Sequence, residues 1–236
     1  MTGNASEIGE IGDRPRLPSQ AIAPGAEIAG NRGLSPISRP ALRRTQILDA
    51  AAQCFRANGF HGASIADISR QAGMSAGHIY HYFENKEAII AAIVERDLER
   101  LGVIWAELKV SHDVRETMVE LSADGVKDTM DSFSAGLRLE IAAEAARNPE
   151  VARIVQAANR CSMVNWAETL RLARQAGGRN DDEETFAAMV EIIAAIFEGL
   201  MVRAIRNPAI NREHMVIMVQ RVMRQIINSP DWGKIA

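Results

Sequence analysis

Cysteine is scarce in this chain of 236 residues, which contains only Cys54 and Cys161. Two cysteines are too few for a disulfide framework, and they fit a protein that stays in a reducing compartment. Neither belongs to a group of Cys and His residues with the spacing of metal ligands. We therefore expect no metal and no cofactor. We interpret Cys54, on the apolar side of the first expected helix, as a small buried hydrophobe.

The sequence also lacks an unbroken apolar run long enough to span a membrane. The most apolar stretch, residues 187–202, is interrupted by Glu191 and Glu198. The first residues are partly acidic and have no compact apolar core, so they do not resemble a signal peptide. With 47% hydrophobic and 24% charged residues, the chain has the composition of an ordinary soluble protein. These features predict a cytoplasmic protein without a membrane partner.

Signatures of catalysis are missing as well. His112 and His214 are isolated, and no nucleophile motif, phosphate-binding loop or His–carboxylate pair accompanies them. An acidic cluster at residues 181–184 stands directly before an expected helix, where negative charge favours the helix N-terminus and needs no catalytic explanation. The sequence therefore predicts a protein that is not an enzyme.

Alternating β-branched runs, which would indicate strands, do not occur, and there are no internal repeats. Apolar residues recur instead at helical spacing over most of the chain. The sequence therefore predicts an all-α fold, with helices at about residues 40–58, 65–72, 76–82, 86–109, 112–130, 133–147, 150–175, 181–206 and 211–228.

The net charge of the chain is −3, which by itself does not favour nucleic acid as a partner. The charge is unevenly distributed, however. Between residues 39 and 90, six basic side chains stand against four acidic ones. Because the local charge decides whether a face can approach phosphate, this part of the chain is compatible with DNA binding.

The most informative stretch, residues 64–87, has the signals of two short helices joined by a tight turn. Ser64 and Asp67 form a capping box that starts one helix at position 65. Gly73 provides the backbone freedom for the turn, and Ser75 is the N-cap of the next helix. This order predicts a helix-turn-helix.

The second of these helices is short and aromatic. Ile79 and Phe83 are four residues apart and can hold it to a core. The residues left to face outward put little bulk at the helix N-terminus, and they are Ala76, Gly77, His78, Tyr80 and His81. A helix of this kind can enter the major groove and bring base edges near its first turn.

Residues 41–100 closely resemble the DNA-binding domain of the TetR family of bacterial repressors. The resemblance includes the helix RRTQILDAAAQCFRANGF and the segment GMSAGHIYHYFENKE, so it is more specific than a lone helix-turn-helix. In one departure, Ala76 and His78 occupy the first turn of the recognition helix, where the family often has Lys, Pro or Thr. The operator sequence therefore cannot be transferred from relatives.

The resemblance implies a homodimeric repressor that binds a palindromic operator in double-stranded DNA and is released by a small-molecule effector. An alternative is an architectural DNA-binding dimer without an effector. The expected DNA contacts come from the first helix, the two N-caps, the recognition helix and the start of the fourth helix. They are Arg43, Arg44, Ser64, Ser75, Ala76, Gly77, His78, Tyr80, His81, Tyr82 and Lys86.

We expect three parts in the chain: a disordered tail at residues 1–38, the DNA-binding head at 39–86, and a ligand-binding and dimerisation domain at 87–228. The tail is rich in Gly, Pro and Ser and has no apolar periodicity. It is either inert or leads into a basic arm, in which Arg43 and Arg44 reach phosphate or the minor groove.

The last two expected helices carry apolar stripes that are broad for packing within one subunit. In TetR-like proteins the equivalent pair forms a four-helix bundle with the partner subunit. The alternative is that both are internal core helices. The expected interface residues are Met189, Ile192, Ile196, Leu200, Met215, Met218 and Val222.

Residues 137–155, LRLEIAAEAARNPEVARIV, resemble the branch of the TetR family that includes the choline-responsive repressors of betaine operons. Glu140 and Glu144 share one helical face. Either they are solvated or paired with Arg138 and Arg147, or one of them receives a cationic group of the effector. The expected pocket for a lipophilic effector, cationic in the second interpretation, comprises Trp105, Phe133, Leu137, Glu140, Ile141, Glu144, Met163 and Trp166.

Overall fold

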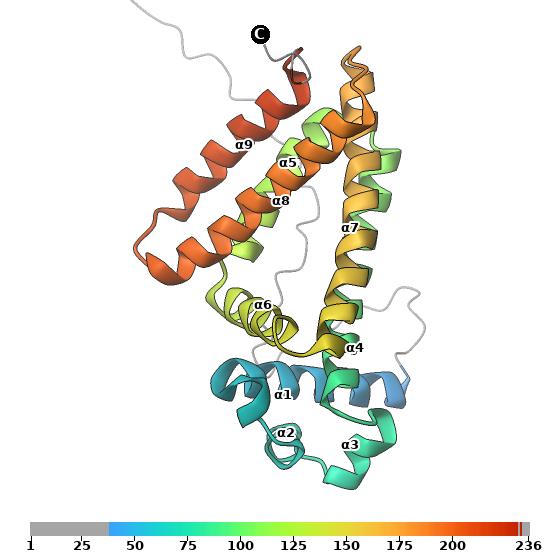
Figure 1. Ribbon diagram of the computed structural model, residues 1–236, viewed down its shortest axis with the longest axis vertical. Helices are drawn as coiled ribbons and strands as arrows, with labels where there is room; N and C mark the ends of the chain where they lie inside the picture. Colours follow the sequence, from blue (N-terminus) through green and yellow to red (C-terminus); the bar gives the residue numbers. More distant parts are fainter. Residues whose placement is uncertain (1–37, 231, 233–236) are drawn as a thin grey trace, which may run out of the picture. The chain divides into compact units, whose positions relative to one another are not determined.

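The computed structural model describes residues 38–230 and 232, and within them the chain is all-α, as predicted, with nine helices and no strand (Figure 1). The helices are α1 (Arg39–Gly62), α2 (Ile65–Ala72), α3 (Ala76–Tyr82), α4 (Lys86–Val110), α5 (Val114–Thr129), α6 (Ser132–Ala145), α7 (Pro149–Ala176), α8 (Glu183–Arg206) and α9 (Arg212–Asn228). The tail predicted at residues 1–38 lies outside the described residues, apart from Ser38, which is the N-cap of α1.

Local sequence signals explain where the helices of the DNA-binding head begin. Ser64 and Asp67 form the predicted capping box of α2, and Ser75 and Asn85 are the N-caps of α3 and α4. Gly73, between α2 and α3, has a φ of 62°, a left-handed conformation that favours glycine. The predicted helix-turn-helix is therefore present.

α1 contains a break at the position where the sequence predicts its end. At Gly59 the backbone leaves the helical conformation, with φ 72° and ψ 166°. This combination is almost restricted to glycine, because a side chain there would be strained. One further helical turn follows as far as Gly62, so α1 is a long helix with a short turn set at an angle to it.

The first hydrophobic core joins the head, formed by α1, α2 and α3, to the helices that follow. Ile47 and Phe55 of α1 and Ile79 of α3 belong to it. Leu137 and Ile141 of α6 are part of the same core, and α6 lies against α1 (Figure 1). Apolar burial therefore ties α6 directly to the DNA-binding head.

The second hydrophobic core lies among α5, α7, α8 and α9. α5 packs along α9, and α4 packs along α7 (Figure 1). α4 contributes Ile89 to the first core and Leu108 to the second. α7 does the same with Val151 and Leu170. These two long helices are therefore shared between both cores.

α8 is the one helix in the described part of the chain that is long and apolar enough to cross a membrane, with a mean hydropathy of 1.9. The sequence predicts no unbroken apolar run of membrane-spanning length, and α8 passes this test although Glu191 and Glu198 interrupt it, because two glutamates are too few to remove the apolar character of the helix. Only 28% of the apolar stretch is buried in the subunit. A core or interface helix passes the same test, so α8 is an apolar helix with much uncovered surface.

Candidate DNA-binding face and effector domain

The outward face of α3 carries the residues predicted to meet DNA. Ile79 and Phe83 are buried and hold α3 to the head, as expected. Tyr80 remains 55% exposed, and Tyr82 is half-buried. The other exposed residues of this segment are Ser75, Ala76, Gly77, His78 and His81. The structure therefore leaves the first turn of α3 unobstructed for approach to a groove.

Three rings gather toward the C-terminal end of α3. The ring centroids of His78 and Tyr82 are 5.4 Å apart, and those of His81 and Tyr82 are 5.3 Å apart, both edge to face. This is an arrangement that aromatic rings favour. Imidazole and phenol groups can donate hydrogen bonds to phosphate or base edges, so the cluster is suited to contact DNA.

Ser64 is first of all a cap. Its hydroxyl donates to Asp67 Oδ2 at 2.6 Å and accepts from the Asp67 amide at 3.1 Å. Hydrogen bonds from Ser64, assisted by the charge of Arg70, hold the pKa of Asp67 below its ordinary value. The contact of Ser64 with phosphate stays a prediction, and any such contact would have to share the hydroxyl with the cap.

The two arginines predicted to form the basic arm are both exposed at the start of α1. Arg43 donates to Gln46 Oε1 at 3.0 Å. Arg44 pairs with Glu95 of α4 at 3.3 Å, and its guanidinium lies 5.3 Å from the centroid of the Phe83 ring. Arg43 is therefore the freer of the two to reach phosphate.

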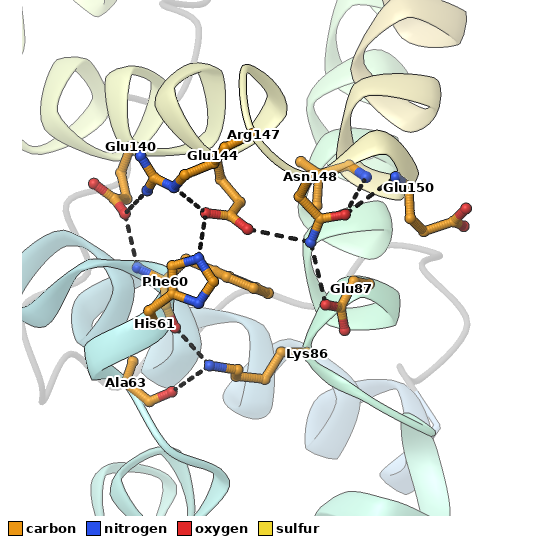
Figure 2. A network of polar contacts seen from close by, with 11 residues as sticks. Phe60, His61, Ala63, Lys86, Glu87, Glu140, Glu144, Arg147, Asn148 and Glu150 are labelled. Atoms are coloured by element: carbon orange, nitrogen blue, oxygen red, sulfur yellow. Dashed lines mark hydrogen bonds and ion pairs between the residues drawn. The ribbon is translucent and has the colours of Figure 1, made fainter.

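Lys86 is placed differently from the prediction of a phosphate contact, because its ammonium group is turned inward. Nζ donates to the carbonyl oxygens of Phe60 at 2.6 Å and Ala63 at 3.0 Å (Figure 2). It also lies 4.4 Å from the centroid of the Phe60 ring, a distance at which a cation is attracted to the ring face. Lys86 thus binds the backbone of the head itself.

The eight residues predicted to line one effector pocket do not come together. Leu137 and Ile141 pack in the core of the head. Phe133 lies 4.9 Å from the guanidinium of Arg56 and lines a hollow of about 380 Å³ beside α1, together with Cys54. The prediction of a single pocket is therefore wrong for α6, because α6 turns this face toward α1.

Glu144 is fully buried at the junction of α6 with the head. Its carboxylate accepts from Arg147 Nε at 2.9 Å and from Asn148 Nδ2 at 3.1 Å, and it lies 3.1 Å from His61 Nε2 (Figure 2). Asn148 is the N-cap of α7. Pairing with Arg147 is one of the alternatives that the sequence leaves open.

Glu140 also faces the head. Its Oε1 accepts from the Phe60 amide at 2.7 Å and lies 3.7 Å from Arg147 Nη2 (Figure 2). The alternative pairing with Arg138 is wrong, since Arg138 binds Asp97 and Asp128 instead. Both glutamates are therefore occupied within the protein and are not free to anchor a cation.

The remaining predicted pocket residues lie in the C-terminal domain. Trp105 of α4 is buried and meets Trp166 of α7 edge to face, with ring centroids 6.0 Å apart. Met163 lies one helical turn before Trp166 and packs, like it, against the second core. The indole Nε1 of Trp105 is buried, and the structure gives it no hydrogen-bond partner.

The residues predicted for a dimer interface divide into two groups. Met189 and Leu200 are buried within the subunit, and of these two Leu200 also lines the groove described next. Ile192, Met218 and Val222 are exposed, and Ile196 and Met215 are half-buried. An apolar groove of about 560 Å³ between α8 and α9 is lined by Ala195, Ile196, Gly199, Leu200, Val202, Arg203, Met215, Met218, Val219 and Val222.

Two sequence models match most of the described chain. Residues 47–93 match the model of bacterial regulatory proteins of the TetR family. Residues 112–228 match that of the C-terminal domain of BetI-type transcriptional repressors. UidR of Escherichia coli strain K12, a helix-turn-helix-type transcriptional regulator, is 36% identical over 143 residues, which are 60% of this chain and 71% of UidR. The chain belongs to the TetR family.

Two further relatives match over nearly their whole length. BetI of Yersinia pestis (strain Pestoides F), also a transcriptional regulator, is 26% identical over 201 residues, 83% of this chain and 96% of BetI. The structure of Salmonella enterica GusR superimposes with a TM-score of 0.68 and 26% identity, covering 82% of this chain and 99% of GusR. The chain is accordingly a TetR-family DNA-binding regulator with a BetI-like C-terminal part. Its relatives are named for transcriptional regulation, a non-enzymatic role.

A buried ion pair at the end of α7 was not predicted from the sequence. Arg174 is fully buried, and its guanidinium donates two hydrogen bonds to the carboxylate of Asp181. It also donates to the carbonyl oxygens of Ile226 and Ser229 at the end of α9. The acidic cluster at residues 181–184 is the available signal, because it lies seven residues from an arginine on an apolar helix face.

Proposed function

We propose that this protein is a homodimeric, cytoplasmic repressor that binds a palindromic operator through α3 and leaves it when a small molecule binds the C-terminal domain. The observation that carries the DNA-binding part is the exposed face of α3, held from behind by Ile79 and Phe83. A dimer would have to place two such helices about 34 Å apart to reach successive major grooves on one face of the duplex.

Mobility-shift titration on a duplex selected by the wild-type protein from random DNA tests this part. Tyr80→Ala and His81→Ala should each weaken binding by about 1–3 kcal/mol if the side chain makes a good base or phosphate contact. His112→Ala is the control, because His112 is exposed in the C-terminal domain. Wild-type affinity of the Tyr80/His81 double variant would exclude this face.

The groove between α8 and α9 supports the dimer. Ile192, Met218 and Val222 are exposed apolar residues on these two helices, and the apolar stretch of α8 is mostly uncovered. Such a surface is costly in water and favours a partner with the same surface, as in twofold dimers. Ile192→Asp should yield monomers in analytical ultracentrifugation. Val103→Asp, at an exposed position of α4, should leave the dimer intact.

The effector site is proposed between α4 and α7 at Trp105 and Trp166. Because Glu140 and Glu144 are occupied, the polar anchor we propose is Trp105 Nε1, a buried donor without an acceptor. A buried donor of this kind costs free energy until an acceptor arrives. The effector would then be an apolar molecule carrying a carbonyl or another acceptor oxygen.

A screen of apolar compounds, read by DNA release and tryptophan fluorescence, tests the effector site. Trp105→Phe keeps an aromatic ring, though a smaller one, and removes the donor, and it should weaken the response to any hit. Trp232→Phe is the matched control, because Trp232 is exposed. If no compound releases the DNA, the architectural dimer without an effector becomes the better interpretation.

A further inference from the structure

The short turn that follows Gly59 is bound from two sides by charged side chains of other helices. At Gly59 the φ of 72° turns the backbone out of α1, and the Phe60 amide donates to Glu140 Oε1 of α6 at 2.7 Å. A Cβ at Gly59 would lie 3.2 Å from the same oxygen. Glycine therefore permits both the turn and the close approach of the carboxylate.

On its other side the turn is bound by Lys86, the first residue of α4. Nζ donates to the carbonyls of Phe60 and Ala63 (Figure 2). Phe60 is thus bound through its amide by α6 and through its carbonyl by α4. Hydrogen bonds with one charged partner are among the stronger ones in proteins.

The bound turn leads directly into the helix-turn-helix. Ala63 is followed by Ser64, the N-cap of α2. α2 in turn sets the position of α3 through the Gly73 turn, where Ser69 donates to the Met74 carbonyl. A displacement of residues 60–63 would therefore move the start of the recognition motif.

We propose that Glu140 and Lys86 are positioning residues for DNA recognition: they fix the turn from Gly59 to Ala63, and neither touches DNA or the effector. The proposal rests on the proposed DNA-binding face of α3. It assigns Lys86 a role other than the phosphate contact that the family resemblance implies. It also makes Glu140 the polar link by which α6 holds the head.

α6 is itself held in place by the second carboxylate. Glu144 binds Arg147, Asn148 and His61, and Asn148 Nδ2 lies 3.4 Å from Glu87 Oε1 next to Lys86. The contacts of Glu140 and Lys86 are therefore two ends of one network, which Figure 2 shows across α1, α4, α6 and α7.

The decisive experiment measures the salt dependence of DNA affinity for Lys86→Met on the duplex selected by the wild-type protein. Methionine keeps an unbranched apolar stem against Phe60 but removes the donors. We expect an affinity loss of about tenfold. Without Lys86 the turn is no longer held in place before binding, and part of the binding free energy, roughly that of one charged hydrogen bond, is used to order it. The slope of log affinity against log salt should not change, because no phosphate contact is lost.

A phosphate contact gives the opposite result, since each one contributes about 0.9 to that slope. A slope reduced by this amount in Lys86→Met would overturn the proposal, and so would an unchanged affinity. Arg43→Ala provides a comparison in the same assay. If Arg43 contacts phosphate, as predicted, this variant should reduce the slope by about 0.9. Lys127→Met, which removes an exposed lysine of α5, should change neither affinity nor slope.

Glu140 is tested by two substitutions that separate its acceptor from its charge. Glu140→Gln keeps an oxygen for the Phe60 amide and should retain most of the affinity, whereas Glu140→Leu should lose about as much as Lys86→Met. Amide hydrogen exchange without DNA gives an independent readout. The Phe60 amide should exchange faster in Glu140→Leu, and the turn from Phe60 to Ala63 should exchange faster in Lys86→Met.

Unchanged exchange in both variants would overturn the proposal even if affinity falls. The hydrogen-exchange measurement also distinguishes a failure of this proposal from a failure of the proposed function. If the wild-type protein selected no duplex, the proposed function would fail, and exchange would still show whether the two side chains fix the turn. In that case the proposed role of Glu140 and Lys86 in DNA recognition would fail together with the proposed function.

Discussion

Two charged side chains near opposite ends of α7 are fully buried: Glu144, in α6 shortly before α7 begins, and Arg174, in the last turn of α7. Their partners differ. Asp181, the partner of Arg174, is itself only 9% exposed. The ionic partners of Glu144 reach water, since His61 is 69% and Arg147 51% exposed. Arg174 is therefore enclosed together with its counter-charge, whereas Glu144 faces ionic partners that solvent can reach.

This difference decides what breaking each network would cost. Removal of one member of an enclosed pair leaves an uncompensated charge in the interior, which is strongly destabilising. Around Glu144, His61 and Arg147 can turn to water when the carboxylate changes. Arg174 thus ties α7 firmly to α9, whereas the ion pairs of Glu144 can exchange for water at smaller cost.

The largest effect is expected at the enclosed anchor. Arg174→Met should lower the free energy of unfolding by about 3–5 kcal/mol, because Asp181 and the α9 carbonyls lose their donors inside the protein. Denaturant unfolding at fixed protein concentration measures this. Arg153→Met is the control, since Arg153 is exposed and pairs with the equally solvent-accessible Glu150, and it should leave the unfolding curve in place. A loss no larger than that of Glu144→Gln would remove the distinction between the two ends.

Gly59→Ala should have the next largest effect, because it strains the turn at the junction. The backbone there is in a region that costs other residues about 1–3 kcal/mol, and the added Cβ would press on Glu140. We expect lower stability together with weaker DNA binding. Gly102→Ala is the matched control: Gly102 lies within α4, and a Cβ there would meet nothing within 4 Å, so stability should be kept or increased.

Glu144→Gln should be milder still. The amide keeps one acceptor, and the partners that lose the charge can be hydrated, so we expect a loss of about 1 kcal/mol in unfolding free energy. Thermal and denaturant unfolding measure it, with Glu168→Gln, which alters an exposed pair with Lys109, as the control. A loss as large as that of Arg174→Met would mean that the junction is as rigid as the far anchor.

The head could be predicted from sequence because its signals are local. Capping boxes, turn glycines and the four-residue spacing of Ile79 and Phe83 act over a few residues, and the structure confirms them. Family likeness supplied the rest of the head. Lys86 is the exception, because the position of an N-terminal lysine is known from sequence, but the direction of its long side chain is set by tertiary packing.

The C-terminal assignments were weaker because helical periodicity tells which residues share a face but not what that face meets. Glu140 and Glu144 share a face with Leu137 and Ile141, and that face packs on α1. The broad stripe of α8 covers two faces, so Met189 falls inside the subunit and Ile192 outside. Partner identity depends on contacts between residues far apart in the chain.

A third charged network, around Asp128, is intermediate in burial between those of Arg174 and Glu144. Asp128, at the end of α5, binds Arg100 of α4 at 3.0 Å and Arg138 of α6 at 2.9 Å, and its side chain is 34% exposed. Burial alone would raise the pKa of Asp128, but the charges of Arg138 and Arg100 outweigh it and hold the pKa below its ordinary value. The network therefore stabilises the fold only while the carboxyl is ionised.

The smallest predicted effect is the pH dependence of this contribution. Because the pKa is lower in the folded state, the stabilisation is fully present above the unfolded pKa of about 3.9, and it is lost as the pH falls through the folded pKa. The difference in unfolding free energy between wild type and Asp128→Asn should therefore be constant near neutrality and shrink below about pH 4. Other carboxyls with lowered pKa, such as Asp67 and Asp182, titrate in both proteins and cancel in the difference. Asp124→Asn, which alters an exposed pair with Lys127, is the control and should show little difference from wild type at any pH. A difference for Asp128→Asn that grows on acidification would mean that burial, and not the two arginines, dominates at this site.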